Sequence, residues 1–325
     1  MRLPRRKLLH LAMGTAAVPL LSPLTWAQTY PSRPVRIIVG FAPGGTSDIS
    51  ARLVGQWLSE RFGRQFVTEN RTGAAGNIAA EYVVNATPDG YTLLVFASAA
   101  AVNATLYTNL NFNFIRDIAP VASILRVPNV ILVNPSFPAA TVPELIAFAT
   151  ANPGKVNMAT AGIGSTPHIF GELFKKMTGV NLLPVHYRGG GPALTDLLAG
   201  QVQVMFDPVG EAIGYIKSGK LRALAVTSAT RLAALPDIPT VGEFVPGYEA
   251  SGWSGMGAPK NTPVQIIDTL NREINEGLAD PNMKARLLDL GSTPLVLSPS
   301  DFGKHIADEI NKWAEVIKSA DIKAE

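Results

Sequence analysis

Five turns rich in Gly or Ser carry the residue types that could do chemistry in this chain. They read PGGTSD, ASAAA, AGIGSTPH, RGGGPA and DPVG, and each follows an apolar run and precedes a helix-like pattern. Glycine lets the backbone approach a ligand closely, and the first amides of a helix favour an anion. The turns therefore predict sites for a small anion, although PGGTSD alone is equally well explained as a tight turn that packs a helix on a strand.

The anion predicted for these turns is not a nucleotide phosphate. The pattern G-x-G-x-x-G fails at PGGTSD, which lacks a third glycine, and at GIGSTP, where Pro167 takes the last place. GYIKSGKL ends in Leu221 instead of Ser or Thr and runs from helix to strand, the reverse of a P-loop. A carboxylate satisfies the same amides, so the loop at Gly44 and Gly45, capped by Ser47 or Asp48, predicts a carboxylate site.

Hydrolase and metal chemistry are weakly supported. GWSGM misses the nucleophile elbow because Met256 replaces its final glycine. Ser165 and His168, three residues apart at a helix start, could form a dyad, but a capping hydroxyl and a pocket-lining imidazole are favoured. His168 and Glu172 could share a helix face, yet further metal ligands are not visible nearby, and the chain has no cysteine. The sequence predicts no catalytic residue, no metal and no cofactor.

The first 27 residues predict an export signal. A basic head with four Lys and Arg precedes an apolar run, and Thr25 and Ala27 are the small residues of a cleavage site after Ala27. Pro19 and Pro23 interrupt the run, which argues against a membrane anchor. RRKLLHLA leaves both Sec and twin-arginine export open. Because those four cations are removed from 28 Lys and Arg against 25 Asp and Glu, the mature chain has a net charge of −1, which argues against nucleic acid as a partner.

The elements that must position the turns alternate between strand and helix. Predicted strands are VRIIVG, QFVTE, YTLLVFA, NVILVNP, KVNMATA, LLPVHY, VQVMFD, LRALAVTS and TPLVLS. Apolar stripes predict one helix along Ile49, Leu53, Val54, Trp57 and Leu58 and another along Phe302, Ile306, Ile310, Trp313 and Ile317. Helices are predicted to stop at Gly63, Gly179, Gly200 and Gly219. The alternation predicts a parallel sheet covered by helices, with ligands at the carboxyl ends of its strands.

The mature chain strongly resembles the tripartite tricarboxylate transporter receptors, the Bug or TctC-like solute-binding proteins. The resemblance rests on residues 30–95, which include VRIIVGFAPGGTSDISARLVGQWL, and on AGIGSTPHIFGELFKKMTG, VHYRGGGPALTDLLAGQVQVMFD and GKLRALAVTSATRLAALPDIPTVGE. It implies an α/β, type II periplasmic-binding-protein-like fold, a Venus flytrap of two domains with a ligand cleft between them. Domain 1 would comprise residues 28–127 and 250–325, and domain 2 residues 128–249. The crossings would be ASILRVPNVILV and YEASGWSGMGAP.

The resemblance also implies which residues bind the ligand's carboxylate, through loop amides, hydroxyls and ordered water. In the first domain these are Phe41, Ala42, Pro43, Gly44, Gly45, Asp48, Ser98 and Ala99. In the second they are Gly164, Ser165, Thr166, His168, Gly189, Gly190 and Asp207. Arg188 is either a further cleft charge or a solvated strand-end residue. Gly40 departs from the family, where Pro is common, and the small side chains of ASAAA leave the identity of the acid open.

The expected function is capture of a small organic acid in the periplasm for the membrane permease of a tripartite tricarboxylate transporter, by a monomer that performs no chemistry. A sensory receptor would use the same closure, and the sequence does not separate the two. An exported hydrolase using Ser165 and His168 is the rival from another class.

Overall fold

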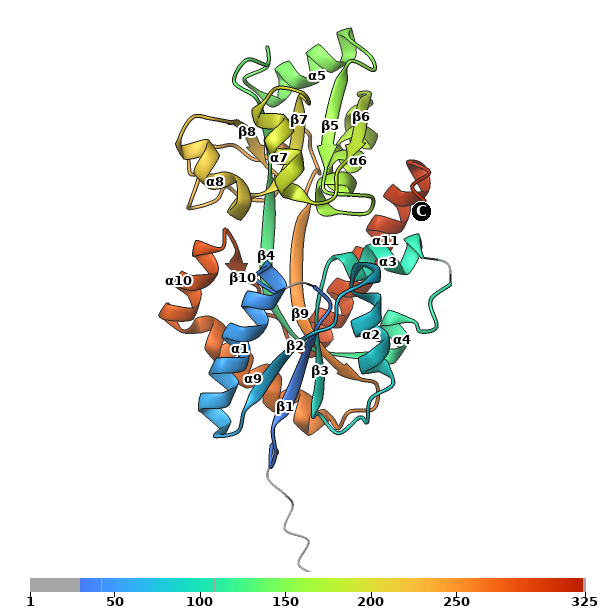
Figure 1. The fold of residues 1–325 in the computed structure, drawn as a ribbon, viewed down its shortest axis with the longest axis vertical. Helices are drawn as coiled ribbons and strands as arrows, with labels where there is room; N and C mark the ends of the chain where they lie inside the picture. Colours follow the sequence, from blue (N-terminus) through green and yellow to red (C-terminus); the bar gives the residue numbers. More distant parts are fainter. Residues whose placement is uncertain (1–29, 42, 108, 324–325) are drawn as a thin grey trace, which may run out of the picture.

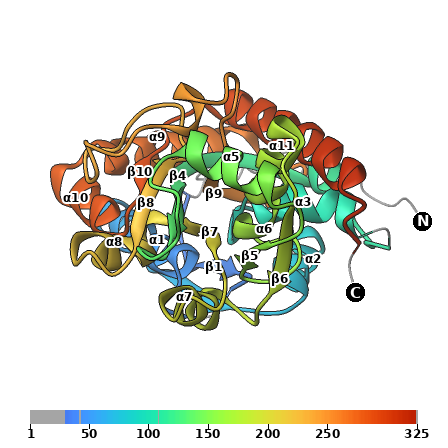
Figure 2. The ribbon, with the colours of Figure 1, turned by 90° about the horizontal axis from the view of Figure 1, so that it is seen from above.

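The computed structural model describes residues 30–323 except residues 42 and 108. The predicted signal, Ala42 and their roles therefore lie outside the described residues. The described chain forms two lobes that are stacked along the long axis of the molecule (Figure 1). Seen from above, helices surround the strands (Figure 2).

One mixed sheet runs through both lobes in the order β2-β1-β3-β9-β4-β7-β5-β6, and β8 and β10 also pair with β4. The strands of the first lobe are β1 (Val35–Val39), β2 (Phe66–Asn70), β3 (Thr92–Ala97) and the two-residue β10 (Thr293–Pro294). Those of the second are β5 (Val156–Thr160), β6 (Leu182–His186), β7 (Val204–Pro208) and β8 (Arg222–Val226).

Two long strands pass between the lobes. They are β4 (Ile118–Val133) and β9 (Ser251–Pro259), which pair with each other in antiparallel register over their lobe-crossing part (Figure 1). The first predicted crossing lies within β4, and the second lies in β9 except for its first three residues, 248–250. Because each joins its neighbours in antiparallel register, the prediction of a parallel sheet is wrong at the centre and right for β2-β1-β3 and β7-β5-β6.

Helices cover both faces of the strands. The first lobe holds α1 (Thr46–Phe62), α2 (Asn77–Val84), α3 (Ala99–Leu106), α4 (Phe114–Asp117), α9 (Val264–Ala279), α10 (Pro281–Asp289) and α11 (Pro299–Ser319). The second holds α5 (Val142–Ala151), α6 (Thr166–Thr178), α7 (Gly190–Leu198) and α8 (Val209–Lys217). Short 3-10 turns lie at Ala74–Gly76 and Val241–Glu243. Both predicted apolar stripes are helices, α1 and α11, and Gly63 and Gly179 end theirs in the left-handed conformation.

Three apolar clusters form the core. One packs α1, α9 and α10 against the first-lobe strands, and another packs α7 and α8 against the second-lobe strands. The third lies on the α11 side and is continuous between the lobes, because Trp313 on α11 stacks on Phe170 of α6 at a centroid distance of 5.3 Å. The lobes are therefore joined on this side by packed aromatic side chains as well as by the two crossing strands.

One predicted strand is mostly absent. Of TPLVLS only Thr293 and Pro294 form a strand, paired with β4; Leu295 adds one backbone hydrogen bond to Ile124, and residues 295–298 have no regular secondary structure. Leu295 and Leu297 are nevertheless packed against the core, which explains why their spacing resembles that of a strand.

Candidate ligand-binding site

The turn after β1 is held by Asp48. Gly44 has φ +85° and donates its N–H to Asp48 Oδ2 at 2.9 Å, and Asp48 is only 2% exposed. Gly45 is the N-cap of α1 with φ −78°, an angle that any residue adopts, so only Gly44 needs the freedom of glycine. Of the two residues predicted to cap α1, Asp48 binds a backbone N–H at the helix start, that of Gly44 just before the N-cap, whereas the N-cap residue Gly45 itself makes no side-chain cap.

The carboxylate of Asp48 stabilises the turn, because its oxygens already accept hydrogen bonds from neighbouring residues. Its carboxylate also accepts from Arg52 Nε at 3.0 Å and from Asn70 Nδ2 at 2.9 Å, and Asn70 Nδ2 in turn reaches the carbonyl of Phe41. Burial opposes its ionisation, but the hydrogen bonds from Arg52, Gly44 and Asn70 outweigh that cost and lower its pKa. The first amides of α1 have no intrahelical acceptor and face the turn, which makes them the donors left for a ligand.

The turn after β3 lies beside the first one because β1 and β3 are parallel neighbours. Ser98 is 4% exposed and donates its backbone N–H to Trp253 O at 2.9 Å, and Ala99 begins α3. Pro43 is exposed at the rim of the first turn, and Phe41 is half-buried beneath it. The described first-lobe residues predicted to bind ligand thus come from two adjacent strand ends.

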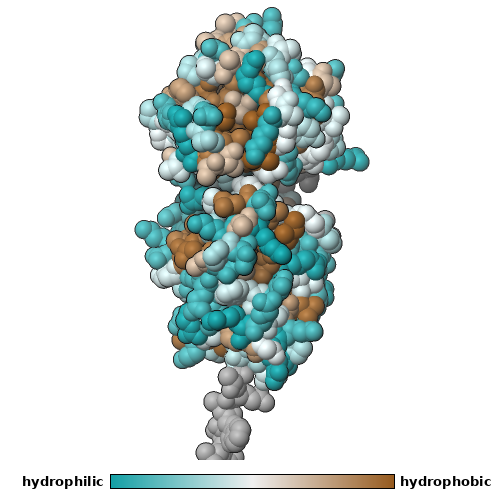
Figure 3. Space-filling model, turned by 90° about the vertical axis from the view of Figure 1, so that its left-hand side faces the viewer, coloured by the Kyte–Doolittle hydropathy of each residue, from teal (hydrophilic) through white to brown (hydrophobic). Residues whose placement is uncertain are grey.

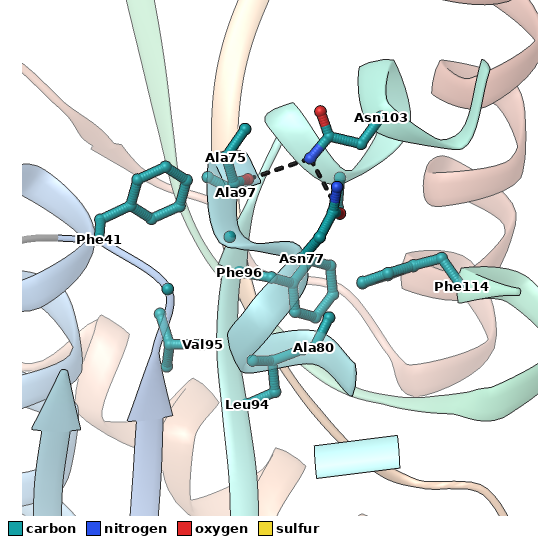
Figure 4. Close-up of a pocket in the computed structure, with 13 residues that line it drawn as sticks. Phe41, Ala75, Asn77, Ala80, Leu94, Val95, Phe96, Ala97, Asn103 and Phe114 are labelled. Carbon is teal, nitrogen blue, oxygen red and sulfur yellow. Dashed lines mark hydrogen bonds between the residues drawn. The ribbon is translucent and has the colours of Figure 1, made fainter. Parts of the chain in front are cut away.

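A third turn, Gly73 to Asn77, joins this group and was not predicted. Phe41, Ala97, Gly76 and Asn77 line one small cavity at the strand ends (Figure 4). Four successive residues of the turn have positive φ, and Asn103 Nδ2 holds it by donating to the carbonyl of residue 75 and to Asn77 Oδ1. Asn77 Nδ2 is buried without a hydrogen-bond partner. The available signal was TGAAGN, another glycine turn before a helix.

In the second lobe, the turn after β5 closes on itself. Gly164 has φ +74° and donates its N–H to His168 Nδ1 at 3.1 Å, while Ser165 Oγ donates to Gly162 O at 2.6 Å. The hydroxyl proton of Ser165 therefore points to a carbonyl, and His168 Nδ1 accepts a backbone amide. The dyad that the hydrolase alternative requires is not formed.

His168 is a buried neutral side chain. Burial lowers its pKa to about 4, and the nearby His186 and Lys175 act in the same direction. The His168 ring lies 4.7 Å from that of His186, and both line a pocket with Glu172 next to residues 320–323. In the described part of the chain no three His, Cys, Asp or Glu side chains gather as a metal site would require.

The turns after β6 and β7 meet at the start of α7. Gly189 has φ +117° and open space around it, and Gly190 is the first residue of the helix. Asp207, at the end of β7, is fully buried, and neither of its carboxyl oxygens has a hydrogen-bond partner. Arg188 is exposed in the turn before Gly189. All the second-lobe residues predicted to bind ligand therefore lie at three neighbouring strand ends.

The turns of the two lobes converge on the same stretch of the crossing strands. In the first lobe, Ser98 Oγ lies 3.6 Å from where a Cβ would stand on Gly252, the partner of Val127 in the sheet. In the second lobe, Thr166 Oγ1 lies 3.4 Å from Asn129 Nδ2, two residues further along β4. Asn129 was missed by the sequence reasoning, and its Oδ1 is buried without a partner.

The two lobes also touch directly beside this point. A methyl group on Gly164 would come within 2.8 Å of Leu106 and 3.5 Å of Val102, both on α3. The surface narrows between the lobes at this level (Figure 3). The turns that carry the described predicted residues of both lobes therefore lie at the level where β4 passes between the lobes. No helix of the described residues is long and apolar enough to cross a membrane.

Comparison with known proteins places this geometry in a family. Residues 50–322 match the model of the tripartite tricarboxylate transporter family receptor. Protein BugT of Bordetella pertussis is 38% identical over 300 residues, which are 91% of this chain and 92% of BugT.

Solved structures agree with that match. A protein of R. palustris solved with adipate has a TM-score of 0.80 at 38% identity, over 90% of this chain and 99% of that one. MatC from Rhodopseudomonas palustris, solved with bound malate, has a TM-score of 0.75 at 32% identity, over 89% and 100% of the chains. The periplasmic binding protein BugD has a TM-score of 0.76 at 36% identity, over 91% and 100%. The predicted two-domain periplasmic-binding fold is thus confirmed.

Members of this family are solute-binding receptors and not enzymes, which agrees with the absence of a Ser165–His168 dyad. The glycine turns that looked like phosphate loops in isolation occur here in a fold that is used to capture solutes between two lobes. This chain belongs to the tripartite tricarboxylate transporter receptor family, the Bug or TctC-type periplasmic solute-binding proteins.

Proposed function

We propose that this protein captures a small organic acid between its lobes and delivers it, unchanged, to the membrane permease of a tripartite tricarboxylate transporter. The observation that carries the proposal is the convergence of amide-rich turns from both lobes on Val127–Asn129 of β4. Main-chain amides at helix starts stabilise a carboxylate as they do a phosphate. The relatives solved with adipate and malate, both dicarboxylates, support the same class of ligand.

In this proposal the first-lobe turns grip one carboxylate, and the second-lobe turns receive the remainder of the ligand. Residues 28–127 with 250–325 act as one domain and residues 128–249 as the other; the change of β4 partner, from β9 up to Pro128 to β7 from Asn129 on, supports this division. The mature protein acts as a periplasmic monomer after cleavage following Ala27. The permease would recognise the closed form, in which both lobes present one continuous surface.

A thermal unfolding screen with carboxylic acids tests the proposal. An acid present at 100 times its dissociation constant should raise the free energy of unfolding by about 2.7 kcal/mol. Adipate and malate are the first probes, with adipamide and 1,6-hexanediol as matched neutral controls that keep the carbon skeleton of adipate. Mass spectrometry should recover the acid unchanged. Equal stabilisation by the neutral controls, or conversion of the acid, would contradict the proposal.

A further inference from the structure

Among the acidic residues that the structure describes, Asp207 is the one whose buried carboxyl oxygens have no hydrogen-bond partner. It is 0% exposed at the end of β7, and both carboxyl oxygens lack hydrogen-bond partners. By contrast, the buried Asp48 in the first lobe receives hydrogen bonds from three different residues. An ionised carboxylate without partners is very costly to bury, so such a group keeps its proton instead.

The neighbours of Asp207 place it at the start of α7. A methyl group on Gly190 would stand 3.9 Å from Asp207 Oδ1 and 2.6 Å from Glu211 Oε2. Two carboxyl groups therefore border the first residue of a nine-residue helix whose amides face the same space. A helix start attracts an anion, but two ionised carboxylates beside it would repel that anion.

The charges around Asp207 can be assigned element by element. Along β7 the side chains alternate, so that Met205 joins the α7 and α8 face and Phe206 joins the α6 face. Asp207 thus shares its face with Glu211 of α8, whereas His168 and Lys175 belong to α6 on the other face. Arg188 is exposed in the turn before α7, and Val130, which pairs with Asp207 from β4, is uncharged. On the β5 side the pairing ends at Ala159 opposite Met205, and both of these residues are uncharged.

Burial raises the pKa of Asp207 to about 8, and the charge of Glu211 raises it in the same direction. Burial of its carboxyl also raises the pKa of Glu211, although that residue is exposed as a whole. At neutral pH Asp207 is accordingly a carboxylic acid, which offers one O–H donor and one carbonyl acceptor.

We propose that Asp207, in its neutral acid form, donates a hydrogen bond to the anionic ligand in the second lobe, so that capture of the ligand requires a bound proton. The inference rests on the proposed function, because it needs a carboxylate in the site. Asp207 then selects the ligand through its own protonation state. The neutral acid donates a hydrogen bond to an anionic ligand, and the ionised form repels it. The affinity for the ligand should therefore depend on pH between pH 7 and pH 9, where Asp207 titrates and the carboxylates of the ligand do not.

The expected pH profile follows from this scheme. The neutral fraction of Asp207 stays high up to pH 7 and falls by about tenfold between pH 7 and pH 9. The affinity for adipate or malate should fall by the same factor, and binding at pH 9 should take up close to one proton per ligand. Dicarboxylates of this kind are fully ionised throughout this range, so the ligand contributes no pH dependence.

Calorimetric titration of the intact mature protein from pH 6 to pH 9 tests the inference with Asp207→Asn. The amide keeps a donor and an acceptor but cannot ionise, so the variant should bind at pH 7 within a few-fold of the wild type and show a flat profile. Glu211→Gln removes the neighbouring charge and should shift the fall in affinity to lower pH. Asp237→Asn, an exposed acid of the same lobe, is the matched control and should leave the profile unchanged.

Stability gives a second measurement that needs no ligand. Because the folded-state pKa of Asp207 is raised from 3.8 to about 8, the folded state holds a proton that the unfolded state has lost over this interval. The free energy of unfolding therefore declines as pH rises towards 8, and this decline should be smaller in Asp207→Asn.

The outcomes separate the two proposals. If the wild type binds no carboxylate at any pH, the proposed function fails. If it binds with a flat profile, or if folded Asp207→Asn loses binding at every pH, then Asp207 acts as an ionised acceptor or not at all, and this inference is overturned while the proposed function stands. If Asp207→Asn does not fold at neutral pH, the neutral form is not the native one, which also overturns it.

Discussion

At the scale of single residues, the opening turn of the site is built by one carboxylate and one glycine. Asp48 holds the Gly44 amide, Arg52 and Asn70 together, and Asn70 reaches back to the carbonyl of Phe41. The amide of Gly44 is thereby occupied, and the following amides at the start of α1 are the ones presented to solvent. Gly44 contributes its φ of +85° rather than a contact with the ligand.

Gly44→Ala should weaken binding of the best acid roughly tenfold or more. A Cβ disfavours positive φ by about 1–2 kcal/mol, so the turn relaxes and the helix-start amides move out of line. One lost hydrogen bond to a charged group accounts for about that factor in affinity. Titration calorimetry measures it. The control Gly219→Ala has a similar φ of +70° with open space around it, after α8, and should lose stability but not affinity. Normal binding by Gly44→Ala would show that the turn geometry is irrelevant.

At the scale of elements, α11 ties the crossing strand β9 to the second lobe. Glu309 on α11 is 8% exposed and accepts the indole N–H of Trp253 at 3.1 Å and that of Trp313 at 2.9 Å. Trp313 in turn stacks on Phe170 of α6. Helix α11 thus holds the crossing strand through the Glu309–Trp253 hydrogen bond. It contacts the opposite lobe through Trp313, which the same carboxylate binds.

Glu309→Met should lower the free energy of unfolding by about 2–4 kcal/mol, because it leaves two buried indole donors without acceptors. Glu309→Gln keeps an acceptor oxygen and should lose about half as much or less. Urea unfolding of both variants at pH 7 makes the comparison, with tryptophan fluorescence as the probe of this cluster. Equal losses in the two variants would mean that the contribution of Glu309 is its charge and not its acceptor role.

At the scale of the whole molecule, glycines let the lobes meet at two places. Gly210, at the start of α8, packs its backbone against Leu290 and Gly291, which follow α10 in the first lobe. Gly164 packs similarly against Leu106 of α3. A Cβ at Gly210 would collide with the carbonyl of Leu290, so the absence of side chains allows this approach. We expect closure to form these contacts while the aromatic packing on the α11 side stays in place.

Small-angle scattering should therefore report a smaller radius of gyration for the wild type with saturating adipate or malate than without it. Gly210→Leu should hold the lobes apart, so that its radius stays at the ligand-free value and its affinity falls. Gly214→Leu lies one turn later on the same helix in open space and should behave as the wild type. If Gly210→Leu contracts normally, the contact at Leu290 does not belong to the closed state.

The sequence by itself determined the elements and the kind of site. Local signals sufficed for β1, α1, α11 and the helix ends at Gly63 and Gly179, because side-chain period and left-handed caps are properties of neighbouring residues. The failed nucleotide motifs and the repeated glycine turns indicated a carboxylate site, the resemblance to a known family implied a receptor, and the family match confirmed the receptor. The ligand-binding residues themselves remain a prediction.

Only the tertiary structure decided how those turns are used. The antiparallel place of β4 and β9, the joining of residues 73–77 to the first-lobe turns and the position of Asn129 depend on partners that are distant in sequence. The same holds for charge: Asp48 and Asp207 both stand at strand–helix junctions, yet one is surrounded by donors and the other lacks partners. Burial and hydrogen bonding set the state of a carboxyl group, and both are supplied by chain that folds back from elsewhere.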